Sequence, residues 1–476
     1  MGSLHAPFVA NEGGYGKIDA SKQEGGECAI DFSHDEESKK LLAYDHSKKE
    51  CWEEEIVGTC SFWQATTNTV ALLFGMGMLA VPYAAQQGGW TSLSLLLVFA
   101  AMSCYTGYLL GKCMKLNPQL LSYQDIAGSA IGMRGRFIFT LCLYVEILAC
   151  LIGFAISIGD NLAQLFPALD IQIFGLHLKP SQFLLTVSLL IVSPTVLMRD
   201  LALVSYLSLG GVVSSLVVVG AVVWTGVFGG VGFTHTIPAL QFGKWPLIVG
   251  LYAFCYSGQV IIPNIYSSMK DPSRFTSDNA TVDTGDSLNA HRPNDLYSLM
   301  GEFSMQMLLV SFTIATIVYG GLAVMGAVMF GDQTLALITL NIPRDLTVGT
   351  VVLWTTVVTP LSKFSLGIAP IALELEGLLP FSFGPKTIVA AGSVIRLGLL
   401  FLILCVAIGV PYFGLALSFI GSAISIGMSV IFPCVFYLIL HRRTMSKAHL
   451  MTNVLIIVAA SAFAVIGTWS SATTAE

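Results

Sequence analysis

The chain has 476 residues, of which 54% are hydrophobic and only 11% are charged. Because soluble domains carry about 25% charged residues, this composition excludes an ordinary soluble protein and indicates one that crosses a membrane several times. The net charge of −6 comes from residues 1–59, where 13 Asp and Glu stand against 6 Lys and Arg. The near-neutral remainder excludes a nucleic-acid binding surface.

The acidic segment 1–59 is expected to be a disordered cytosolic tail, because it is polar and rich in charge. We recognise in it no apolar h-region of a cleavable signal peptide. The run Glu37-Ser38-Lys39-Lys40-Leu41-Leu42 fits the acidic dileucine pattern that sorting adaptors read on endolysosomal and vacuolar cargo. A solvated segment without a partner is the competing interpretation, since so short a pattern often occurs by chance.

The rest of the chain contains eleven mainly apolar runs, each near the length of about 20 residues that spans a bilayer as a helix. We therefore expect an all-α membrane protein with eleven transmembrane helices. The runs are 61–85, 90–112, 136–166, 181–198, 203–227, 246–269, 302–330, 348–375, 387–409, 411–440 and 450–470.

The first and sixth runs are interrupted in the middle. The first contains Gly75-Met76-Gly77-Met78 before Pro82, and the sixth contains Ser257-Gly258 before Pro263. A helix that breaks inside hydrocarbon must line a cavity or pack against protein, because its backbone groups need partners. Two interrupted helices five runs apart predict two inverted repeats of five helices, a substrate site between them and one extra helix.

Four parts follow from this pattern. They are the tail 1–59, a first repeat 60–228, a second repeat 229–440 with a polar cytosolic loop 270–301, and residues 441–476 with the eleventh helix. If the N-terminus is cytosolic, twelve Lys and Arg lie in inside loops and three in outside loops. This bias favours a cytosolic N-terminus, and the odd number of runs then places the C-terminus on the lumenal or external side.

Four segments resemble the amino acid/auxin permease family, and within it the eukaryotic vacuolar amino acid transporter branch. They are GMGMLAVPYAAQQGGW (75–90), SYQDIAGSAIGMRGR (122–136), LYVEI with GDNLAQLFP (143–167) and PLSKFSLGIAPIALELEGLLP (360–380). The resemblance covers about residues 56–470 and implies an eleven-helix version of the sodium-coupled leucine transporter architecture. It also implies amino acid transport, usually driven by a proton gradient, across a vacuolar, lysosomal or plasma membrane.

A zwitterionic amino acid needs partners for its carboxylate and for its ammonium, and a broken helix supplies both. The half-helix that starts near Met78 offers N–H groups and a positive dipole end to the carboxylate, while carbonyls at the two breaks suit the ammonium. Glycine kinks used only for tight helix packing are the competing interpretation. The candidate substrate residues are Phe74, Gly75, Met76, Gly77, Met78, Tyr144, Tyr256, Ser257 and Gly258.

Lys363 lies inside the eighth run, where a charge costs roughly 2.5–3.5 kcal/mol on insertion scales and therefore has a function or a partner. In the architecture that the resemblance implies, a sodium ion often sits between the eighth and first helices. We expect Lys363 to replace that positive charge or to titrate as the coupling site; a structural ion pair or snorkelling is the alternative. Glu146 in the third run is a second candidate proton carrier, unless it pairs permanently with Lys363 or Arg396.

Sodium coupling would need several oxygen ligands, and Thr359 of the eighth run could offer a hydroxyl. In sodium-coupled relatives the first helix supplies an Asn four residues before its Gly-x-Gly turn, whereas this sequence has Ala71 there. This departure favours protons, although Asn68 one turn earlier keeps sodium open.

The sequence thus predicts a secondary active, proton-coupled amino acid transporter in a vacuolar or lysosomal membrane, with the plasma membrane as second choice. A sodium-coupled symporter at the plasma membrane and an amino acid sensor that signals through its tail are the alternatives. An enzyme, a metal or a cofactor is not expected, because the runs contain no metal-spaced His, Asp and Glu cluster and no Ser nucleophile motif. The expected partners are the amino acid, protons, the lipid bilayer and a sorting or signalling protein at Glu37–Leu42.

Overall fold

The computed structural model describes residues 61–116, 120–167, 171–173, 176–197, 201–268, 293–377, 379, 385–410, 412–443 and 445–474. The acidic tail with its Glu37–Leu42 motif, and residues 269–292 of the predicted loop, lie outside these ranges.

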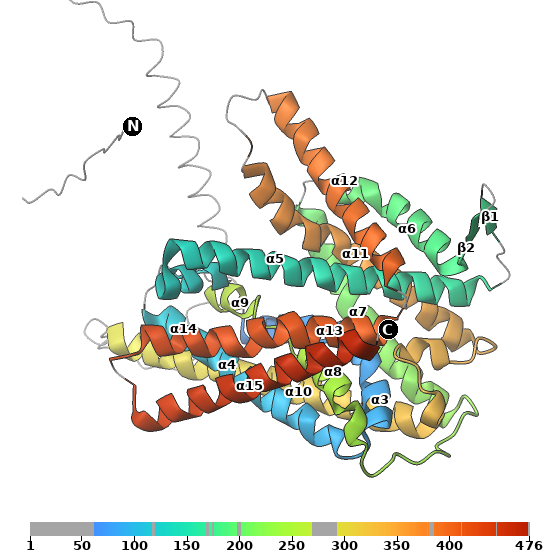
Figure 1. The fold of residues 1–476 in the computed structure, drawn as a ribbon, viewed down its shortest axis with the longest axis horizontal. Coiled ribbons are helices and arrows are strands. Elements are labelled where there is room, and N and C mark those ends of the chain that lie inside the picture. Colours follow the sequence, from blue (N-terminus) through green and yellow to red (C-terminus); the bar gives the residue numbers. More distant parts are fainter. Residues whose placement is uncertain are drawn as a thin grey trace, which may run out of the picture. The chain divides into compact units, whose positions relative to one another are not determined.

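Figure 1 shows the elements in chain order. They are α2 (Phe62–Leu73), α3 (Gly77–Gly88), α4 (Ser92–Leu116), α5 (Tyr123–Leu165), β1 (Ile171–Ile173), β2 (Leu176–Leu178), α6 (Pro180–Leu197), α7 (Leu201–Val227), η1 (Phe242–Lys244), α8 (Trp245–Cys255), α9 (Ile262–Ser268), α10 (Pro293–Phe330), η3 (Gly331–Gln333), η4 (Ile338–Asn341), α11 (Thr347–Gly377), α12 (Pro385–Gly409), α13 (Phe413–Ile420), η5 (Gly421–Ser425), η6 (Gly427–Ile431), α14 (Phe432–Leu440) and α15 (Lys447–Thr474).

Two of the long helices begin at side-chain caps that the sequence encodes. Ser61 and Gln64 exchange hydrogen bonds between side chain and backbone at the start of α2, with distances of 2.8 and 3.3 Å. Ser122 and Asp125 do the same at the start of α5. Such capping boxes satisfy N–H groups that have no partner inside the helix, and they fix where each helix starts.

Eight helices among the described residues are long and apolar enough to cross a bilayer, or nine if α2 and α3 form one bent span. Each of the eleven predicted runs contains helix. However, the apolar segments 213–227 and 242–255 are shorter than a full span. The structure therefore supports an all-helical multi-pass protein, and the count of eleven stays a prediction.

Several boundaries differ from the sequence-based expectation. Helix α10 begins at Pro293, inside the stretch predicted as loop 270–301, in keeping with the preference of Pro for the first helical turn. Helix α5 begins at Tyr123 and is broken at Gly132, whose φ of 73° is accessible mainly to glycine. Strands β1 and β2 form a short antiparallel hairpin, with Ile171 opposite Leu178, that the all-α prediction did not include.

The tenth run is one apolar stretch, but its middle is wound as two π-helical turns, η5 and η6. Here the chain approaches α8 so closely that Gly421 lies directly against Gly250, where a Cβ atom on either residue would overlap the other helix. The π-helical turns and the paired glycines are found together, which fits the frequent placement of π-bulges at sites of function or close packing.

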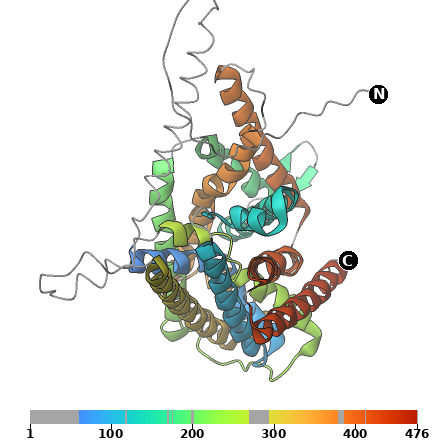
Figure 2. The same ribbon diagram turned by 90° about the vertical axis from the view of Figure 1, so that its left-hand side faces the viewer.

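The long helices pack as two groups. In one group α5 contacts α6, α11 and α12, and α11 and α12 also contact α6. In the other, α10 contacts α2, α3 and α4, and α8 contacts α3 and α4. Figures 1 and 2 show α6, α11 and α12 together on one side of α5, with α3, α4, α8 and α10 on the other side. Helix α7 contacts α11 of the first group and α10 of the second.

A buried ion pair holds the first group together. The Arg396 guanidinium of α12 lies 3.1 Å from the Glu376 carboxylate of α11, with side chains only 4% and 10% exposed. Arg396 also donates a hydrogen bond of 3.1 Å to the Val196 carbonyl of α6. Three helices are therefore joined at one guanidinium, and Arg396 is paired with Glu376 instead of Glu146.

Candidate functional site

The first run is interrupted at its glycines. Helix α2 ends at Leu73, α3 begins at Gly77, and the two are bent by 56°. No side chain caps the start of α3, so its first N–H groups and its positive dipole end are available to a carboxylate. The sixth run is interrupted as well, since α8 ends at Cys255 and α9 begins only at Ile262.

The two interruptions meet in space. A Cβ atom added to Gly77 would lie 2.8 Å from both Cα and Sγ of Cys255, and one added to Gly258 would lie 3.3 Å from the Leu72 side chain. Gly75 differs, because a Cβ there would meet only the carbonyls of Leu72 and Leu73, at 3.6 and 3.9 Å. Glycine at 77 is thus required for the crossing of the two broken helices, whereas Gly75 leaves its side of the backbone open.

Hydroxyl groups from two other helices bind the carbonyls at these breaks. The fully buried Tyr319 of α10 has its hydroxyl against the Leu73 carbonyl and 3.3 Å from the Cys255 carbonyl, so it joins the end of α2 to the end of α8. Ser215 of α7 donates a hydrogen bond of 2.9 Å to the Phe74 carbonyl. The sequence analysis missed both residues, because a single Tyr or Ser in an apolar run looks like packing. It also counted the Phe74 carbonyl as unpaired, whereas Ser215 occupies one of its two acceptor positions.

A cavity of about 730 Å³ lies at the junction of the two breaks, within the range of about 300–1,000 Å³ typical of small-molecule sites. Asn68, Ala71 and Leu72 of α2 line one side of it. Its remaining lining comes from the two breaks and from the facing helices, namely Leu73, Gly75, Met76, Gly77, Cys150, Phe154, Phe254, Cys255, Ser257, Gly258, Ile261, Ile265 and Lys363. The cavity therefore lies between the two helix groups.

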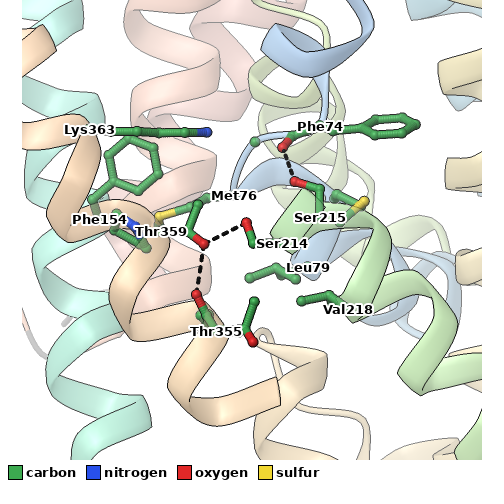
Figure 3. Close-up of a pocket in the computed structure, with 14 residues that line it drawn as sticks. Phe74, Met76, Leu79, Phe154, Ser214, Ser215, Val218, Thr355, Thr359 and Lys363 are labelled. Atoms are coloured by element: carbon green, nitrogen blue, oxygen red, sulfur yellow. Dashed lines mark hydrogen bonds between the residues drawn. The ribbon is translucent and has the colours of Figure 1, made fainter. Parts of the chain in front are cut away.

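A second, smaller cavity of about 40 Å³ adjoins the first break on the α7 and α11 side. Figure 3 shows Thr355, Thr359, Ser214 and Phe74 around it. Thr359 Oγ1 lies 2.6 Å from Ser214 Oγ and 2.7 Å from the Thr355 carbonyl, which links α11 to α7. Oxygen atoms from two helices thus gather where the resemblance places a sodium ion.

Lys363 lines both cavities. Its ammonium nitrogen lies 5.7 Å from the centre of the Phe154 ring, within the range of a cation–π contact. Figure 3 shows the amine of Lys363 pointing across the pocket toward the first break. The Lys363 amine therefore lies in the region between α11 and the broken first run.

Three predicted site residues lie outside the lining of the two cavities. Tyr144 lies beside Glu374 of α11, and the Tyr256 hydroxyl is 2.9 Å from Thr316 of α10. A role of either tyrosine in substrate binding stays a prediction. Glu146 is 7% exposed and lies near Ser425 of η5, but neither carboxylate oxygen has a hydrogen bond of ordinary geometry among the described residues.

Long apolar helices, two interruptions that meet, and a cavity between two helix groups are features of membrane transporters with interrupted helices. The comparison with protein families agrees. The family described as transmembrane amino acid transporter protein matches residues 58–282 and 301–473. The chain belongs to this family, whose members are transporters and not enzymes.

Relatives and solved structures support the assignment. The chain is 36% identical over 438 residues to the amino acid transporter AVT1H of Arabidopsis thaliana, which covers 91% of this chain and 95% of the relative. Its fold matches the inward-facing conformation of Mhp1 with a TM-score of 0.53 and 13% identity, over 88% of this chain and 92% of that one. It also matches a mutant manganese transporter of Eremococcus coleocola with a TM-score of 0.55 and 14% identity, over 88% and 90%. These structural likenesses show the fold alone.

Proposed function

We propose that the chain is a proton-coupled amino acid transporter that works by alternating access and binds its substrate at the two interrupted helices. The observation that carries the proposal is the cavity of about 730 Å³ at the junction of the two breaks. The substrate carboxylate would bind the uncapped start of α3. Its ammonium would bind carbonyls at the breaks, with Gly75, Met76, Ser257 and Gly258 as the walls.

The two helix groups suggest which parts move. The sequence divides into a first repeat 60–228, a second repeat 229–440 and a last helix in 441–476, which together would give eleven spans. In this proposal α2, α3, α8 and α9 with their neighbours move against α5, α6, α11 and α12. Because the cavities lie between the groups, such a movement would expose the site to one side of the membrane at a time.

Lys363 and Glu146 are the proposed coupling residues. The Lys363 ammonium lies beside the oxygen atoms around Thr359, where it would compete with a sodium ion for the same place. Glu146 is buried without a hydrogen-bond partner among the described residues, and an ionised carboxylate is costly in such surroundings. Both features favour a cycle in which protons enter and leave and sodium is not required.

Uptake of labelled amino acids into proteoliposomes tests the proposal. A pH gradient should drive accumulation, a protonophore should abolish it, and a sodium gradient should have no effect. Lys363→Ala should lose gradient-driven accumulation but retain exchange of internal for external amino acid, whereas Lys179→Ala, at an exposed loop position, should behave like the wild type. Uptake that requires sodium and ignores pH, or unchanged accumulation in Lys363→Ala, would overturn the coupling.

The vacuolar or lysosomal membrane is the proposed location, because a proton gradient across it can drive such a cycle and because the tail carries the Glu37–Leu42 sorting pattern. A tagged full-length chain should reach that membrane, and Leu41→Ala/Leu42→Ala should divert it to the cell surface. Localisation of the wild type at the plasma membrane would contradict this part of the proposal.

A further inference from the structure

A third cavity shares no lining residue with the two cavities at the breaks. It lies at the ends of helices where several Lys and Arg residues occur. It has a volume of about 510 Å³, is open to the surface, and is lined by the end of α4, the end of α14 with the residues after it, and the start of α15. Its polar lining consists of Lys112, Lys115, Tyr437, His441, Ser446 and His449. Among the described residues that line it there is no Asp or Glu, so the cavity concentrates positive charge.

Aromatic rings hold the inner cations in place. The Lys112 ammonium lies 4.6 Å from the centre of the Tyr108 ring and 5.9 Å from that of Tyr437. The Tyr437 ring in turn stacks on the His441 imidazole, with centres 4.3 Å apart. Burial, and secondly the positive charge of Lys112, lower the pKa of His441 below its ordinary value. These contacts position the Lys112 and His441 side chains at the cavity.

The start of α15 adds to the positive electrostatic potential at the cavity. Ser446 caps the helix, because its hydroxyl accepts a hydrogen bond of 3.3 Å from the His449 N–H. Since Ser446 and His449 both line the cavity, the positive end of this 28-residue helix faces it. Helix starts of this kind favour anions and phosphate groups.

We propose that this cavity binds the phosphate headgroup of an anionic membrane lipid. The neighbouring surface favours a lipid over a free phosphate. Leu116, which lines the cavity, is 52% exposed, and Leu450 and Met451, which follow the lining residue His449 in the chain, are 46% and 73% exposed; such apolar surface suits contact with acyl chains. The bias of Lys and Arg predicts that this face is cytosolic, where anionic lipids are concentrated and basic pockets between transmembrane helices bind headgroups. Bound there, the lipid joins α4, α14 and α15.

The bias of Lys and Arg alone offers a simpler explanation, in which these residues only orient the chain. That explanation predicts that any two cations of this loop region are equivalent. Arg442 and Arg443 provide the comparison, because they belong to the same face and are exposed but do not line the cavity. A headgroup site requires Lys112 and Lys115 and tolerates loss of the two arginines.

The test is thermal unfolding of the purified full-length chain in detergent. The added compounds are short-chain phosphatidylinositol bisphosphate, short-chain phosphatidylcholine and soluble inositol trisphosphate. We expect the bisphosphate lipid to raise the melting temperature of the wild type and of Arg442→Gln/Arg443→Gln equally, and phosphatidylcholine to leave it unchanged. Lys112→Gln/Lys115→Gln should lose the shift. His449→Glu places a carboxylate at an exposed position of the lining and should also lose the lipid-induced rise in melting temperature. This variant provides the test if the double lysine variant does not fold.

Three outcomes would overturn the inference. An absent shift in the wild type would remove the site. A shift that survives in both the lysine variant and His449→Glu, or that falls equally in the arginine variant, would reduce it to diffuse attraction. A shift of the same size with inositol trisphosphate would exclude the lipid as the source of the phosphate.

Discussion

Gly77 and Gly75 stand two residues apart in the same interruption but face different surroundings. We expect Gly77→Ala to force the two broken helices apart, because its Cβ would lie 2.8 Å from the Cα of Cys255, and such overpacking costs about 1–3 kcal/mol. Gly75→Ala should leave stability unchanged, because its Cβ meets nothing closer than 3.6 Å. Melting temperatures in detergent measure the difference, and equal values for the two variants would contradict the crossing geometry.

His441 provides a pH-dependent readout of the lipid site. The groups that face it are Lys112 of α4, Tyr437 of α14 and His449 of α15. Its pKa is lowered by burial and then by Lys112, and a bound phosphate would stabilise its protonated form and raise that pKa. The bound state then holds more protons, so lipid affinity should strengthen as pH falls through the bound-state pKa of His441 and level off below its free-state pKa.

Titration of the lipid-induced melting shift against pH measures this effect. His449→Gln serves as the background, so that only one cavity histidine titrates. In that background His441→Gln should remove the strengthening at low pH and leave the weakening that protonation of the lipid's phosphomonoester groups causes, since their second pKa is about 6 and the lysines stay charged throughout this range. A profile that is the same with and without His441 would exclude the imidazole as a cause.

At the scale of elements, the Arg396–Glu376 pair joins α12, α11 and α6. We expect Arg396→Met to cost about 3–5 kcal/mol, because it removes the guanidinium that pairs with the buried Glu376 carboxylate. The double variant Arg396→Met/Glu376→Met should recover most of that loss, since an apolar pair of similar volume needs no desolvated charge. Arg136→Met, at the pair with Asp125 whose side chains are 43% and 26% exposed, should cost no more than about 1 kcal/mol.

Chemical denaturation in detergent of the wild type, these three variants and the single variant Glu376→Met gives the comparison. The decisive quantity is the coupling between positions 396 and 376, obtained from the double-variant cycle. If the double variant is no more stable than Arg396→Met, the burial of an unpaired charge is not what destabilises the single variant.

The sequence predicts helices best where their cause is local. Apolar runs locate the long helices, and the stretch around Gly75 and Gly77 marks the place where α2 ends and α3 begins, because backbone freedom is a property of the residue itself. The Tyr319 and Ser215 hydrogen bonds could not be predicted in this way. Each joins a carbonyl to a hydroxyl from a helix far away in the chain, so it depends on how the helices pack.

The same reason explains why Tyr144 and Tyr256 lie outside the lining of the two cavities. Tyr144 and Tyr256 lie in the predicted runs, but the face of a helix that meets the cavity depends on its rotation against its neighbours. Lys363 could be predicted, since a charge in an apolar run needs a polar environment wherever the helix turns. The π-helical turns at 421–431 have no counterpart in the hydrophobic pattern, which reads them as ordinary helix.

At the scale of the whole transmembrane unit, the exposed lining of the large cavity belongs to α2 and to the residue before α9. Asn68 lies on α2 and is exposed, and Ile261, which is 40% exposed, lies directly before α9. Elsewhere, the Gln86 amide of α3 donates a hydrogen bond of 3.0 Å to Asp332, and Thr339 donates one of 2.9 Å to Asn161 of α5. These bonds join α3 and α5 to the segment between α10 and α11.

If the N-terminus is cytosolic, as predicted, these exposed lining residues would face the cytosol, and thiol labelling tests orientation and access together. In a background without reactive cysteines, a membrane-impermeant thiol reagent added from the cytosolic side should modify Ile261→Cys, and a transported amino acid should slow the reaction because it fills the cavity. Leu335→Cys, 47% exposed on the opposite side, should react only with reagent added to the lumenal or external side. Its reaction should not depend on substrate, because it lies outside the cavity lining. If Ile261→Cys reacts only from the lumenal or external side and Leu335→Cys only from the cytosolic side, the predicted orientation is inverted. If substrate does not slow labelling of Ile261→Cys, the cavity is not the substrate site, even if orientation and fold are right.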